Sequence, residues 1–425
     1  MSKQLAIHGG PRAVPEGTIK PWPPIDETDF QLVKESLSGT NHTFGPNCTK
    51  LQEEFAAWNG NGYAILTNSG TAALHMAVYA CGCGAGDEVI VTSYSWSSSA
   101  TCILHHNSIP VFVDINYDTM NIDEDKIEAA ISPKTKAIIA VHLHGLPCNM
   151  DKINAIAKRH NLPVIEDCCQ AHGATFGGVK VGKLGNCAAF SFNQNKCMCS
   201  GEGGMFVTDD EEMAQRARML WSFGETRTPS ESRDYHAYAL GWMYRSSDLV
   251  AAFGRAQLAK LDRNSETLLA NWARLTECLE GTPNLILPRE YPGAKTNGYN
   301  FTMRFDMEAM GHADDARQFR DKLVRAMNAE GVQTGVWQSF ILPEMTVFRA
   351  KNGYGGGCPW SCPMARQPNV DYDPANFPVA QRHCETHTGM TQPLRAPNGP
   401  EAAELTAEGI RKVLANIGEV EAVEL

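Results

Sequence analysis

Short apolar segments alternate with amphipathic segments over roughly residues 50–260. Apolar runs bounded by turn residues predict strands, and periodic apolar positions predict helices. Nearly continuous apolar runs are typical of strands buried on both faces of a sheet. The predicted strands are 63–67, 88–92, 110–114, 137–142, 163–167, 188–192 and 205–208, with helices at 150–160 and 211–220 between them. This order predicts an α/β fold with a large, mostly parallel sheet and helices on both faces.

The remainder of the chain predicts a smaller C-terminal α/β domain. A helical pattern over 247–261 continues into 265–279 and leads into it. Further helices are predicted at 314–330 and 407–417, further strands at 300–305 and 332–336, and a long loop rich in Gly, Pro and Cys at 351–378. We therefore expect an N-terminal arm (1–35), a large domain (36–265) and a small domain (266–425).

Composition narrows the possible functions. Apolar residues make up 43% of the 425 residues and charged residues 20%, which excludes a disordered or collagen-like chain. The net charge of -11 and the lack of a long Lys/Arg block argue against nucleic-acid binding. The sequence offers neither an apolar signal segment at its start nor a run of about 18 apolar residues. We expect no membrane span and a cytoplasmic protein.

The chain has 14 cysteines, which could suggest a metal site. Their spacings do not form two separated C-x-x-C pairs, the pattern that predicts zinc. We expect reduced thiols that act as small hydrophobic residues, and no metal.

Residues 68–74, Asn-Ser-Gly-Thr-Ala-Ala-Leu, follow one predicted strand and open a helix. Small residues at such a helix start let backbone N–H groups approach a phosphate, which makes Gly70 and Thr71 candidate ligands. The alternative is an ordinary capped helix start. After a later strand, Ser93–Ala100 contains Trp96, whose ring could stack on a planar cofactor or belong to the core.

Two further strand ends carry reactive side chains. The strand at 163–167 ends in Asp167, with Gln170 just beyond it, and ligands of open α/β sheets lie at the carboxyl ends of strands. A carboxylate there can keep a ring nitrogen protonated, or it can serve as a helix cap or salt bridge. The strand at 188–192 delivers Ser191 and then Lys196, which could form a Schiff base or be a surface amine.

These segments occur in a characteristic order: Gly-Thr at 70–71, an aromatic residue at 96, Glu-Asp-x-x-Gln-Ala-x-Gly-Ala at 166–174, Phe-Ser-Phe-x-x-x-Lys at 190–196 and Gly-Glu-Gly-Gly at 201–204. Together they resemble the DegT/DnrJ/EryC1/StrS family of pyridoxal-phosphate (PLP) dependent sugar aminotransferases, which have fold type I. The resemblance covers residues 35–265 well and the remainder thinly.

The resemblance implies a role for each residue. Lys196 and Asp167 are the catalytic residues: Lys196 forms the Schiff base with PLP, and Asp167 pairs with the pyridine nitrogen. The residues expected to bind the cofactor in the large domain are Gly70, Thr71, Trp96, Asp167, Gln170, Ser191 and Lys196. Burial and the nearby cationic ring are expected to lower the pKa of Lys196.

One departure from the family concerns cofactor binding across a homodimer. Where family members have Gly-Tyr-Asn-Tyr-Arg, this chain has Gly-Trp-Met-Tyr-Arg at 241–245. The family's Asn reaches the phosphate in the neighbouring subunit, and Met243 has no group to donate a hydrogen bond. Arg245 could replace that donor. A homodimer is still expected from the resemblance.

The resemblance implies transfer of an amino group from glutamate or glutamine to a keto-sugar or keto-cyclitol. Residues 5–11 and the Trp-Pro pair at 22–23 are more similar to members that use glutamine. His142, His144 and Trp337 are candidate pocket residues, although core packing is the favoured role for each.

Three alternatives remain. Some relatives are PLP-dependent sugar dehydratases with a His in place of the lysine, which Lys196 argues against. A non-catalytic, cofactor-binding regulator of the same fold would be compatible with Met243. A nicotinamide oxidoreductase needs Gly-x-Gly-x-x-Gly after the first strand, which the chain lacks.

Overall fold

The computed structural model describes residues 4–226, 235–365 and 370–425. Its centre is a seven-stranded sheet in which β9 runs opposite to the other six strands, so the predicted mostly parallel sheet is confirmed. In spatial order the strands are β1 (Tyr63–Thr67), β9 (Gly204–Thr208), β8 (Cys187–Ser191), β5 (Val164–Asp167), β4 (Thr135–Val141), β2 (Glu88–Thr92) and β3 (Ile109–Val113).

Helices cover both faces of this sheet, as predicted. Successive residues of a strand point to opposite faces, and β1 illustrates the result: Ala64 and Leu66 join one apolar cluster, while Ile65 joins another. The first face is covered by α2 (Pro46–Asn59), α6 (Met150–Arg159) and α8 (Asp248–Leu279), and the second by α3 (Gly70–Ala80), α4 (Ser98–Leu104) and α7 (Glu211–Trp221).

A second, antiparallel sheet has the order β10 (Leu285–Ile286), β12 (Phe301–Phe305) and β13 (His387–Met390). The predicted strand at 332–336 was wrong, because only Gly335 pairs there, in an isolated bridge with Gly389. Gln333 has a left-handed φ of 54°, which interrupts an extended run. The helices beside this sheet are α9 (Ala316–Ala329), α11 (Pro378–Thr386), α12 (Pro400–Leu414) and α13 (Ile417–Glu421).

The remaining elements are short. A third small sheet contains β6 (Thr175–Phe176), β7 (Val179–Lys180) and β11 (Ala294–Lys295), and the other helices are α1 (Glu27–Ser38), α5 (Glu124–Ile127) and α10 (Thr346–Arg349). The described part of the long loop at 351–378 packs on the edge of the large sheet, where Tyr372 donates to the carbonyl of Pro110 at 2.7 Å.

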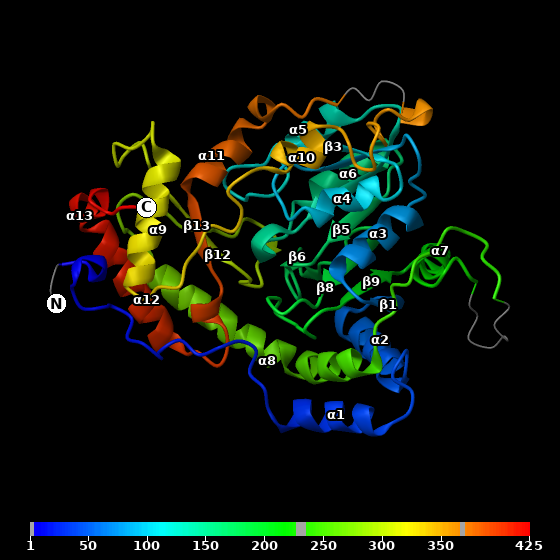
Figure 1. Ribbon diagram of the computed structural model, residues 1–425, viewed down its shortest axis with the longest axis horizontal. Helices are drawn as coiled ribbons and strands as arrows, with labels where there is room; N and C mark the ends of the chain where they lie inside the picture. Colours follow the sequence, from blue (N-terminus) through cyan, green and yellow to red (C-terminus); the bar gives the residue numbers. More distant parts are fainter. Residues whose placement is uncertain (1–3, 227–234, 366–369) are drawn as a thin grey trace.

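The two helices predicted around residues 247–279 form one continuous 32-residue helix, α8. Figure 1 shows α8 running beneath the seven-stranded sheet and the second sheet, with α1 beside it and the C-terminus near α9 and α13. The predicted boundary at 265/266 falls inside this helix, and the division into arm and two domains stays a prediction. No helix of the described segments has the length and apolar character needed to cross a membrane.

Candidate active site

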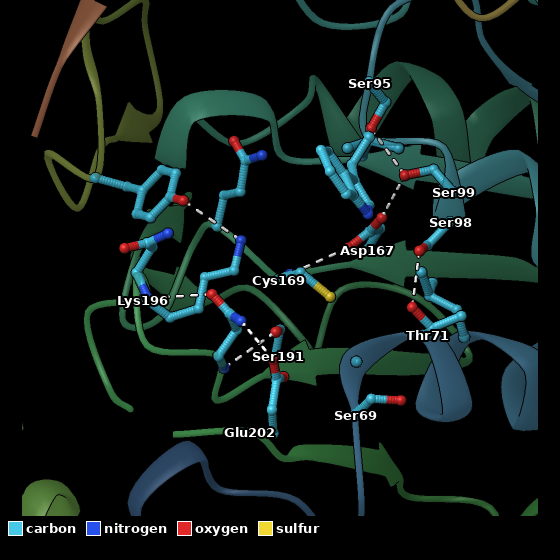
Figure 2. Close-up of a pocket in the computed structure, with 18 of the residues that line it drawn as sticks. Ser69, Thr71, Ser95, Ser98, Ser99, Asp167, Cys169, Ser191, Lys196 and Glu202 are labelled. Atoms are coloured by element: carbon cyan, nitrogen blue, oxygen red, sulfur yellow. Dashed lines mark hydrogen bonds between the residues drawn. The ribbon is translucent and has the colours of Figure 1, made fainter. Parts of the chain in front are cut away.

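A cavity of about 440 Å³ opens at the carboxyl ends of the parallel strands. All seven predicted site residues line it: Gly70, Thr71, Trp96, Asp167, Gln170, Ser191 and Lys196. Figure 2 shows Lys196, Asp167, Ser191 and Thr71 around the same space, delivered by separate elements. This is the position at which open α/β sheets bind ligands.

The start of α3 forms one side of the cavity. Ser69 caps the helix by accepting a hydrogen bond from the backbone N–H of Ala72 at 3.1 Å. A Cβ atom on Gly70 would lie 2.7 Å from the Cβ of Ser191 and 2.9 Å from the Cys169 sulfur, so only glycine fits there. The first N–H groups of a helix have no acceptor within it, and its dipole favours an anion. The capped start and the anion site are therefore compatible interpretations of this segment.

Asp167 is held by two donors. Its Oδ2 accepts from the Ser99 hydroxyl at 2.7 Å, and its Oδ1 accepts from the backbone N–H of Cys169 at 3.1 Å. Ser99 in turn contacts Ser95, and Thr71 contacts Ser98, each at 2.7 Å between hydroxyl oxygens. These contacts fix the carboxylate within the cavity lining.

The neighbouring acid, Glu166, points to the opposite face of β5. Its carboxylate accepts from His142 Nε2 at 2.9 Å and from three backbone N–H groups, those of Gly182, Leu184 and Gly185. With Cys168, His142 and Glu166 could hold a metal ion by distance. Four hydrogen bonds already occupy both carboxylate oxygens, so we interpret the group as structural. His142 thus lies outside the cavity.

Lys196 donates a hydrogen bond from Nζ to the Tyr299 hydroxyl at 3.4 Å, so it is no isolated surface amine. The protein groups leave the pKa of Lys196 above its ordinary value. Burial, the largest influence, lowers this pKa, but Tyr299, Cys169 and Asp167 together outweigh it. The prediction that the pKa of Lys196 is lowered was therefore wrong for the protein groups without the cofactor, because the sequence did not reveal Tyr299.

Gln170 and Trp96 face the cavity in different ways. The Gln170 side-chain oxygen accepts from the backbone N–H of His144 at 2.7 Å, which leaves its NH₂ group to face the cavity. Trp96 is 57% exposed and is therefore not a core residue. Trp337 also lines the cavity, whereas His144 is buried behind it with its ring 5.1 Å from that of Trp337.

Sequence reasoning missed several lining residues. Ser95, Ser98 and Ser99 belong to a visible run of small polar residues after β2, but Tyr299 has no motif around it. The other lining residues that were not predicted are Ser69, Leu74, Val141, Cys169, Asn193, Asn195 and Glu202.

The segment that departs from the family pattern lies beside the start of α3. Asn68 donates from its backbone N–H to the carbonyl of Tyr244 at 2.9 Å and from its amide to that of Met243 at 3.4 Å. The Met243 side chain is 51% exposed. The guanidinium of Arg245 lies 5.4 Å from the Phe223 ring.

Comparison with known proteins gives consistent results. A GDP-perosamine synthase of Caulobacter vibrioides is 42% identical over 243 residues, which cover 57% of this chain and 64% of the relative. An L-glutamine:2-deoxy-scyllo-inosose aminotransferase of Streptomyces paromomycinus is 37% identical over 295 residues, or 66% of this chain and 69% of the relative. The solved structure of 3-amino-5-hydroxybenzoic acid synthase superimposes with a TM-score of 0.82 and 26% identity, covering 94% and 99% of the two chains.

The sequence pattern of the DegT/DnrJ/EryC1/StrS aminotransferase family matches residues 23–367. This match includes residues 23–35 of the predicted arm, the seven-stranded sheet, α8 and β12, and thus every lining residue of the cavity. The chain is therefore an aminotransferase that belongs to the DegT/DnrJ/EryC1/StrS family.

Proposed function

We propose that the cavity binds PLP and that the enzyme moves an amino group from glutamine or glutamate to the ketone of a sugar or cyclitol. The observation that carries this proposal is the joint arrangement of Lys196, Asp167 and the start of α3 around one cavity. An amine, a carboxylate and an anion site are the three groups that an aldehyde, a pyridine nitrogen and a phosphate require.

The cavity lining fits such a cofactor. The missing Cβ at Gly70 lets Ser191 pack against the start of α3, so the hydroxyls of Thr71 and Ser191 would add donors for a phosphate beside the first N–H groups of that helix. When bound, PLP would supply an electron sink for the negative charge left on a carbon that loses its proton.

The chain's own residues would then handle protons and orientation. Asp167, fixed by Ser99 and Cys169, would hold a proton on the ring nitrogen. Lys196 would bond the cofactor aldehyde and, once released, move a proton at its Nζ atom. The NH₂ group of Gln170 would donate a hydrogen bond to the ring oxygen of the cofactor, and Trp96 would pack on the ring face.

The names of the relatives support the proposed substrates. One relative acts on a deoxy-scyllo-inosose and takes its amino group from L-glutamine, while another makes a GDP-linked aminosugar. An inosose is a ring ketone, so we propose a ring ketone as acceptor here. The cyclitol and the nucleotide-linked sugar remain alternatives for the test below.

We also propose a homodimer built over the mouth of the cavity. Trp96 at the cavity and Leu240, Trp242 and Met243 in the segment beside α3 expose between 44% and 80% of their surfaces, and exposed large apolar residues favour a protein partner. The carbonyls of Met243 and Tyr244 accept hydrogen bonds from Asn68, which places this segment beside the start of α3 and the cavity. A second copy seated there would complete the cavity.

The test is a two-stage absorbance experiment on the purified enzyme with PLP. Addition of glutamine, and separately of glutamate, should bleach the aldehyde band of the cofactor. A panel of nucleotide-linked keto-sugars and inosose-type cyclitols should then restore it, and the acceptor that does so fastest is the substrate class. An unchanged spectrum with both donors would contradict the proposal.

A further inference from the structure

Three residues from distant stretches of the chain meet beside Lys196. Tyr299 lies just before β12, Arg395 follows β13, and Trp22 belongs to the N-terminal arm. The Arg395 guanidinium lies 5.4 Å from the Tyr299 ring and 5.1 Å from the Trp22 ring. The arm and the C-terminal part of the chain therefore both reach the lysine, through one cation and two aromatic rings.

Arg395 is buried without an acidic partner. It is 2% exposed, and the described residues provide no carboxylate within ion-pair distance of it. Its Nη2 donates to the backbone carbonyl of Asn195 at 2.6 Å, and its Nε has no hydrogen-bond partner. Because a buried, unpaired cation is costly, its retention points to a function. Its contacts indicate that it supports Tyr299 and the residue before Lys196.

Tyr299 is also fixed from its backbone. Its N–H donates to the side-chain oxygen of Asn297 at 2.9 Å, and the Asn297 amide donates to the carbonyls of Gln170 and His172 at 3.1 Å each. Gly145, at a left-handed φ of 89°, makes room for Asn297, because a Cβ atom there would collide with the asparagine oxygen. The phenol is thus tied to the segment that follows Asp167.

The result is a hydroxyl held next to the reactive amine. Lys196 Nζ lies 3.4 Å from the Tyr299 hydroxyl and 5.0 Å from the ring centroid. A phenol hydroxyl can accept from an ammonium and can donate to a neutral amine. A long contact of this kind is typical of catalytic hydrogen bonds before the substrate binds.

We propose that Tyr299 is a further catalytic residue, which orients the Lys196 amine in both of its protonation states, and that Arg395 is the residue that positions Tyr299. The proposal rests on the proposed function, in which Lys196 alternates between a bonded and a free amine. Tyr299 also raises the pKa of Lys196, so it stabilises the protonated amine.

The first test measures Lys196 in the full-length chain from which the cofactor has been removed. Acetic anhydride labels the neutral amine, and mass spectrometry of the peptide with Lys196 gives the midpoint pH of labelling. Tyr299→Phe should move this midpoint to lower pH. Tyr372→Phe is the matched control, because its buried hydroxyl bonds Pro110 and Trp360 away from the cavity, and its midpoint should equal that of the parent.

The second test uses the enzyme with PLP in a single turnover with glutamine. Tyr299→Phe should slow bleaching by about tenfold to a hundredfold with little change in the half-saturating glutamine concentration. Arg395→Lys keeps the charge but loses the planar guanidinium, and its bleaching rate should fall between those of the parent and Tyr299→Phe. Equal midpoints and equal rates in the parent and Tyr299→Phe would overturn the inference. A shifted midpoint in a protein that no donor bleaches would refute the proposed function and leave the contact between Tyr299 and Lys196 supported.

Discussion

The cavity has two sides that the chain builds in different ways. The floor, made by Gly70, Asp167, Gln170 and Ser191, comes from short segments at the ends of neighbouring strands. The far wall, made by Tyr299 and Trp337 with Arg395 and Trp22 behind Tyr299, comes from segments more than a hundred residues away along the chain from most of the floor. We infer that the floor would hold the cofactor, whereas the wall orients the amine of Lys196.

The largest effect is expected when the amine of Lys196, which both sides of the cavity share, is removed. Lys196→Ala should lower turnover by about a thousandfold or more, because it removes the amine that moves the proton. PLP should still bind, more weakly, through the floor. Steady-state kinetics and a cofactor titration would measure both, and turnover comparable with the parent would refute the assignment.

Adjacent acids on β5 test the floor itself. Asp167→Asn should lower the rate by about a hundredfold or more with little loss of stability, since its amide oxygen can accept from the Cys169 N–H and its amide NH₂ can donate to the Ser99 hydroxyl. Glu166→Gln should do the reverse and lower the free energy of unfolding by about 2–4 kcal/mol, because the carboxylate accepts four buried hydrogen bonds. Chemical denaturation and single-turnover kinetics on both variants would separate the two roles. Equal losses of rate and of stability in the two variants would contradict them.

Three buried histidines near the far wall, His144, His383 and His387, should make the stability of the protein sensitive to acid. Burial lowers the pKa of His144 and of His387 to about 3, and that of His383 well below its ordinary value. A lowered folded-state pKa means that the unfolded chain takes up protons first, so stability should fall as the pH drops from about 6.5 towards 3.

His383→Phe offers a control for this acid sensitivity. Both ring nitrogens of His383 are buried without hydrogen-bond partners, so a phenyl ring loses no bond. The free energy of unfolding of the variant should decrease less steeply below pH 6 than that of the parent. At pH 8 the two values should be equal. Equal pH profiles of the free energy of unfolding would show that this histidine contributes nothing to the acid response.

The smallest expected effect is on cofactor affinity and concerns the proposed homodimer. Met243→Asn restores a donor at the position where the family has one, and it should lower the dissociation constant of PLP about threefold to tenfold. Met243→Ala is the control and should bring no gain. A titration of the cofactor by absorbance would show the difference, and equal affinities would indicate that the segment does not reach a neighbouring cofactor.

The two sides also differ in how far the sequence predicts them. The seven strands of the large sheet follow from apolar runs, and every floor residue lies in a motif at a strand end or helix start. Tyr299 and Arg395 could not be predicted, because their positions depend on long-range contacts such as that of Asn297 with Gln170 and that of Arg395 with Asn195. The failed strand at 332–336 has a similar origin, since its apolar pattern could not reveal a left-handed Gln333.

The most direct test of the proposed link between Lys196 and PLP is to reduce the PLP-loaded enzyme with borohydride and then map its peptides. The amine at position 196 should carry the only pyridoxyl group, and Tyr299→Phe should carry it at the same site. A cofactor fixed at another lysine, or an unlabelled peptide in a protein that still binds PLP, would contradict it.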